Sequence, residues 1–122
     1  MEERTHPVSY ALTVARTIWE LSNDAINEGR LPETMTTSMV RTAEQAALSL
    51  GLFAMSRQHM LPGPVINAIE SAKIDLETLM QLADLIPSCH PTPKNATHIA
   101  LAIRDTAEQA ANHLKQAEDA LP

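Results

Sequence analysis

Apolar residues recur at intervals of three and four positions in four stretches of the chain, and prolines or glycines separate the stretches. This spacing aligns apolar side chains along one side of an α-helix, so the pattern predicts four helices. The predicted core positions are Val8, Ala11, Leu12, Ala15, Ile18, Trp19, Ala25 and Ile26 in the first stretch, Met39, Ala43, Ala46, Leu50 and Phe53 in the second, Val65, Ile69, Ala72, Leu76, Leu79, Ala83 and Ile86 in the third, and Ala100, Ile103, Ala107, Ala110, Leu114, Ala117 and Leu121 in the fourth.

Turn-forming residues set the expected ends of the first two helices. Pro7 suits the first turn of the first helix, and Gly29 stops that helix. The second helix begins after a run of hydroxyl residues between Thr34 and Ser38, any of which could cap it. Its end stays open, because Gly51 lies either inside the helix or close to its last turn.

The other two helices are bounded by prolines. Pro62-Gly63-Pro64 marks the start of the third helix, and Pro87 ends it. The fourth helix is capped either by Asn95 or by Thr92, which precedes Pro93.

Four helices of about 20 to 25 residues, each about 30 Å long, are the parts of an antiparallel four-helix bundle. We therefore expect an all-α fold in one domain spanning residues 1–122, with one hairpin at about 5–60 and the second at about 62–121.

The sequence also repeats itself. The segment 42–47, Thr-Ala-Glu-Gln-Ala-Ala, recurs letter for letter at 106–111, and the segment 17–23 aligns with 78–84. The offsets are close to half the chain, so one helical hairpin used twice, with a pseudo-twofold axis, explains the pattern. Chance recurrence of common residues in alanine-rich helices explains it equally well.

The apolar stripes of the first and third helices are broad, since Tyr10, Val14 and Leu21 widen the first and Ile66 and Ile74 widen the third. A helix-mediated homodimer would use this surplus. Alternatively, the small residues of the second and fourth helices let a monomeric bundle close tightly and bury both stripes.

Composition excludes several classes of protein. There are 18 Ala and 14 Leu but only three aromatic residues, which disfavours an all-β fold. A single Cys rules out a disulfide scaffold, and a hydrophobic content of 44% argues against disorder.

Charge and hydropathy narrow the partners and the location. The net charge is -6 and basic residues never occur side by side, so we expect no nucleic acid partner. No stretch approaches the roughly 18 uncharged apolar residues of a membrane span, so we expect no membrane partner. The first residues are acidic where a secretory signal is basic, which with the single Cys indicates the cytoplasm.

Motifs for catalysis and for metal binding are not found. Di-iron bundles need Glu-x-x-His pairs, but the residue three positions after Glu20, Glu44, Glu77 or Glu108 is never His. Three Gly are too few for phosphate-binding loops, so we expect no metal, no cofactor and no enzymatic activity. Cys89, next to His90 in a proline-rich segment, is either a reactive or an inert thiol.

Two sets of residues are candidates for function. Aromatic residues dominate interface hot spots and methionines adapt to varied partners, so the candidate protein contacts are Tyr10, Trp19, Met35 and Met39. A polar cavity between helices would have to be built from Arg16, Arg41, Glu44, His98 and Arg104.

The first set supports the main hypothesis, a non-enzymatic protein-interaction or regulatory module that acts through a helix face, as an inhibitor, immunity, antitoxin-like or adaptor protein. The alternative is a small-molecule-binding bundle or an enzyme with a polar interhelical cavity. An exposed apolar patch over a dry core would favour the first, and a polar internal pocket the second.

Overall fold

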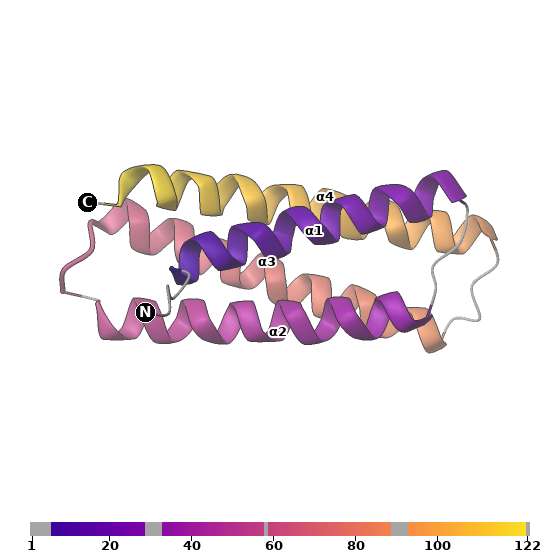
Figure 1. Ribbon diagram of the computed structural model, residues 1–122, viewed down its shortest axis with the longest axis horizontal. Helices are drawn as coiled ribbons and strands as arrows, with labels where there is room; N and C mark the ends of the chain where they lie inside the picture. Colours follow the sequence, from indigo (N-terminus) through magenta and orange to yellow (C-terminus); the bar gives the residue numbers. More distant parts are fainter. Residues whose placement is uncertain (1–5, 29–32, 58, 89–92, 122) are drawn as a thin grey trace, which may run out of the picture.

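The computed structural model describes residues 6–28, 33–57, 59–88 and 93–121. They form four helices: α1 (Pro7–Glu28), α2 (Glu33–Ser56), α3 (Gly63–Ser88) and α4 (Pro93–Ala120). Each of α1 and α3 packs against both α2 and α4, and consecutive helices run in opposite directions (Figure 1). The predicted all-α, antiparallel four-helix bundle is confirmed.

The start of α1 is fixed by the residue before the predicted Pro7. The backbone N–H of Val8 donates to Nδ1 of His6 at 3.1 Å, which caps the helix. The His6 ring also meets the ring of Phe53 edge to face, with 4.7 Å between the centroids. The first turn of α1 is therefore held against the end of α2.

The last turn of α4 also lies beside the first turn of α1. The Ser9 hydroxyl donates to Oε2 of Glu118 at 3.0 Å, and Figure 1 shows both helix ends at the end of the bundle that carries the α2–α3 connection.

Three helix ends differ from the predictions. Helix α2 runs through Gly51 to Ser56, which settles where the second helix ends. Helix α3 includes Pro87 and ends at Ser88, because a proline in the final turn removes only one of the helix's hydrogen bonds. Helix α4 begins at Pro93, so Asn95 lies inside the helix and is not its cap, while Thr92 lies outside the described residues.

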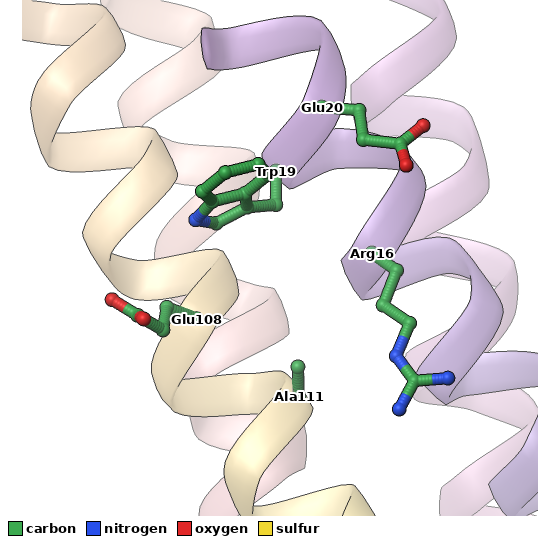
Figure 2. A pocket seen from close by; sticks show the side chains of 5 residues that line it. All are labelled: Arg16, Trp19, Glu20, Glu108 and Ala111. Carbon is green, nitrogen blue, oxygen red and sulfur yellow. The ribbon is translucent and has the colours of Figure 1, made fainter.

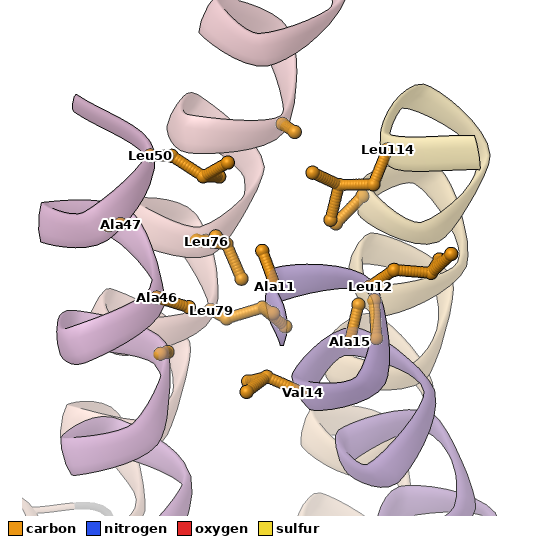
Figure 3. Close-up of a cluster of buried hydrophobic side chains, with 14 of the residues drawn as sticks. Ala11, Leu12, Val14, Ala15, Ala46, Ala47, Leu50, Leu76, Leu79 and Leu114 are labelled. Carbon is orange, nitrogen blue, oxygen red and sulfur yellow. The ribbon is translucent and has the colours of Figure 1, made fainter. Parts of the chain in front are cut away.

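The core is a single cluster of apolar side chains from all four helices (Figure 3). Nearly all the predicted core positions are buried, while Trp19 and Phe53 pack against the cluster from its edge. Among the described residues the only buried polar side chain is Ser22, whose hydroxyl donates to the carbonyl of Ile18 at 2.7 Å. The interior is therefore dry and apolar.

The two copies of the repeated segment lie in equivalent environments. Ala43 and Ala46 of α2 are fully buried, as are Ala107 and Ala110 of α4. The threonine that begins each copy donates its hydroxyl to the carbonyl four residues earlier, as do Thr17 and Thr78 in the second aligned pair. Equal burial is what a duplicated hairpin predicts, and duplication itself stays a prediction.

Candidate functional site

The five residues of the predicted polar cavity do not come together. Arg16, Arg41, Glu44 and His98 are exposed on three different helices. Arg104 is half-buried, and its guanidinium donates to Oδ1 of Asn23 at 3.1 Å, which ties α4 to α1. These residues surround no common space, so the arrangement expected for an internal polar pocket is not formed by them.

One of them, Arg16, lines a groove of about 160 Å³ between α1 and α4, together with Trp19, Glu20, Glu108 and Ala111. The Trp19 ring lies between the two helices, above the small side chain of Ala111 (Figure 2). The charged ends of Arg16 and Glu108 point away from each other (Figure 2). The groove is therefore a shallow apolar recess and has no convergent polar groups.

The predicted contact residues lie in different environments. Met39 belongs to the core and is only 3% exposed, so it is not available to a partner. Tyr10 and Trp19 are half-buried against the core, and the Tyr10 hydroxyl donates to Oε1 of Gln45 at 3.4 Å. The side chain of Met35 lies outside the described residues.

Sequence reasoning missed the most exposed apolar surface on a described helix. Leu48, Leu52 and Met55 of α2 are 61%, 69% and 77% exposed. They follow one another at i, i+4 and i+7, so they form one stripe on the side of α2 that faces away from the core. Together with Gly51, which completes the i, i+3, i+4, i+7 set, they are called the α2 face below. Their helical spacing is visible in the sequence, but the stripe is hidden there by the stronger core stripe of the same helix.

The repeat allows this surface to be compared with the equivalent part of α4. At the offset of 64 residues, the α2 face corresponds to Asn112, Lys115, Gln116 and Asp119, which we call the α4 face. All four residues are exposed. The Lys115 ammonium lies 3.2 Å from the Asp119 carboxylate and 3.7 Å from that of Glu118, so its charge is satisfied within the helix. Position for position, one helix is apolar where its counterpart is polar.

A second groove, of about 220 Å³, runs between α2 and α3 beside the α2 face. Gly51 and Met55 belong to both, and Ile66 and Ile69 of α3 form the opposite wall. Lys73 extends along this groove, with Nζ 3.4 Å from the point that a Cβ on Gly51 would occupy. The missing side chain at position 51 therefore deepens the recess next to the stripe.

The expected apolar surplus is found in a different place. Tyr10 and Leu21 of α1 pack against the core, and Val14 is buried, so α1 contributes no exposed stripe. On α3 only Ile74 is a large exposed side chain, at 62%. The surplus that the sequence assigned to the first and third helices lies mainly on the second.

The nearest approach of two titratable groups between helices is also structural. Nδ1 of His113 in α4 lies 2.8 Å from Oδ2 of Asp75 in α3, and both side chains are partly buried. Within the described ranges, no three His, Cys, Asp or Glu residues gather closely enough to hold a metal ion. Cys89, with its open question of reactivity, lies outside the described residues.

None of the helices in the described part of the chain is both long enough and apolar enough to cross a membrane. Comparison with protein-family models, with curated proteins and with solved structures finds no match to this chain.

Proposed function

We propose that this chain is a non-enzymatic protein-interaction module that binds protein through the α2 face. The observation that carries the proposal is the contrast between two equivalent helices. Leu48, Leu52 and Met55 are exposed at positions where the counterpart helix has Asn112, Gln116 and Asp119. A contiguous exposed apolar patch on a small domain marks a site of association.

The energetics support a contact of this kind. Covering a leucine or methionine side chain contributes about 1.5–3 kcal/mol relative to leaving it in water. Three such side chains on one straight helix can offset a useful part of the entropy lost on association. The dry core beneath the α2 face keeps it rigid, so little further ordering is needed when a partner binds.

A rigid helical face of this size suits a regulatory role in the cytoplasm. The module would act by covering a surface of its target, as an inhibitor, immunity protein or antitoxin does, or by holding two proteins together, as an adaptor does. A small-molecule or enzymatic role would need convergent polar groups around a cavity. The five candidates for that role lie on three helices without a common space, so we propose only the interaction role.

The test compares two matched variants with the unmodified chain as baits in an extract of the cells that make it. One replaces the α2 face by its counterpart (Leu48→Asn, Leu52→Gln and Met55→Asp), and the other alters the α4 face (Asn112→Ala, Gln116→Ala and Asp119→Ala). We expect a protein at stoichiometric amount, whether the same chain or another one, on the unmodified and α4-face baits but not on the α2-face bait. Equal capture by all three baits, or none by any, would overturn the proposal.

A further inference from the structure

We infer that the partner of the α2 face is a second copy of this chain, paired so that the two α2 helices run antiparallel across a twofold axis. The inference rests on the proposed function and names the occupant of the surface described there. A twofold interface uses the same patch on both copies, so the patch must be complementary to itself.

The α2 face has that property because its residues form both a knob and a hole. Leu48, Gly51, Leu52 and Met55 stand at i, i+3, i+4 and i+7, the four positions that surround the hole in knobs-into-holes packing. Gly51 has no side chain and so makes this hole deep, and the Leu52 side chain beside it projects into solvent at 69% exposure. With the axis midway between these two residues, each Leu52 lies over Gly51 of the second copy.

The same register pairs the remaining apolar side chains. Residues whose numbers add to 103 then lie opposite one another, which places Leu48 of each copy beside Met55 of the other. The groove between α2 and α3, walled by Ile66 and Ile69, continues the recess on one side. Lys73 lies at its rim as a flexible side chain that can move aside.

Charged residues at the two ends of the α2 face complement each other in this orientation. Glu44 precedes the face and Arg57 follows it, both are exposed, and neither forms an ion pair with any residue in the described ranges. The antiparallel register places Glu44 of one copy opposite position 59 of the other, two residues from Arg57. Since that offset is about 3 Å along the helix, the arginine side chain spans it. A parallel pairing would instead bring Glu44 beside its own copy.

The expected interface is small. From Glu44 to Met60 it is roughly 24 Å long, and α2 with the adjoining groove is roughly 20 Å wide, so each copy covers roughly 500 Å². A total near 1,000 Å² lies at the lower limit of specific interfaces, where dimers are weak. We expect a dissociation constant on the order of tens of micromolar.

Sedimentation equilibrium of the purified chain, up to about 500 µM, tests the pairing. We expect a monomer–dimer equilibrium that the α4-face variant keeps. The α2-face variant should be monomeric throughout, with a dissociation constant raised by about tenfold or more and unchanged helical circular dichroism. A chain that stays monomeric at the highest concentration, or an α2-face variant that dimerises as well as the original, would overturn the inference.

A charge exchange tests the antiparallel orientation. Glu44→Lys alone and Arg57→Glu alone should each weaken the dimer, and the two changes together should restore it, because the pair is re-formed with reversed signs. Failure of the double variant to recover would contradict this register.

The outcomes separate this inference from the proposed function. If the purified chain is monomeric but another protein is captured through the α2 face, the interaction role stands and the second copy is excluded as partner. If capture also does not depend on the α2 face, both fail.

Discussion

The C-terminal halves of α2 and α4 have equivalent inner sides and opposite outer sides. Leu50 and Leu114 occupy matched positions and are both fully buried. The outer positions carry Leu48, Gly51, Leu52 and Met55 on α2 but Asn112, Lys115, Gln116 and Asp119 on α4. Packing requires apolar residues on the inner side of both helices, whereas nothing in the monomer requires them on the outer side of α2. The outer side is therefore where information about function is to be sought.

The inner equivalence is tested by matched truncations, which have the largest expected effect. Leu50→Ala and Leu114→Ala should each lower the free energy of unfolding by about 2–5 kcal/mol, because each leaves a cavity in the shared core. Urea denaturation of the two variants should give similar losses. A loss at only one position would show that the two helices are not equivalent in the core.

The next effect concerns the half-buried positions, where α4 has His113 and α2 has Ser49. His113→Ala removes the 2.8 Å contact with Asp75, whose side chain is only 14% exposed and would lose its partner. We expect a loss of about 1–2 kcal/mol in denaturation. Ser49→Ala is the matched control and should change stability by less than about 0.5 kcal/mol. Equal effects at both positions would show that the His113–Asp75 contact contributes nothing specific.

Gly51→Ala should raise the free energy of unfolding by about 0.5–1 kcal/mol, since alanine is the better residue inside a helix. The added Cβ would meet Lys73 Cε at 3.6 Å and Nζ at 3.4 Å, and this side chain can adjust. The same variant should weaken dimerisation, because it fills the hole. A gain in both stability and association would mean that the recess at position 51 does not receive a side chain.

The smallest effect on stability is expected from exchanging the outer faces. Leu48→Asn, Leu52→Gln and Met55→Asp should each change the free energy of unfolding by less than about 0.5 kcal/mol at low protein concentration, because these side chains already lie in water. The measurement is urea denaturation below the concentration at which dimers form. A loss of several kcal/mol would show that the α2 face supports the fold itself and would remove it as a candidate binding surface.

The sequence predicted the fold because each core stripe repeats at helical spacing over several turns. Positions such as Ile18, Ile69 and Ile103 repeat the same signal, and a single exception cannot obscure it. The helix ends were less well predicted. Pro87 and Asn95 have strong local preferences, but in a final turn or a first turn those preferences cost too little to decide where the helix stops or starts.

The candidate site could not be predicted in the same way. An apolar residue outside the main stripe, such as Leu48 or Leu52, can be covered by a neighbouring helix or left in water, and sequence spacing does not distinguish the two. The placement of α1 and α3 around α2 decides it. Met39 shows the converse, since its soft side chain suggested a partner contact and the packing buried it in the core.

The contact between Ser9 and Glu118, at 3.0 Å, has a consequence for the connectivity of the chain. It brings the first turn of α1 and the last turn of α4 together, so a short linker could join them while the chain is opened between α2 and α3. The resulting circular permutant would run α3, α4, α1, α2 and keep all four helix pairings. The order in which the two hairpins are synthesised is thus separable from the architecture that they build.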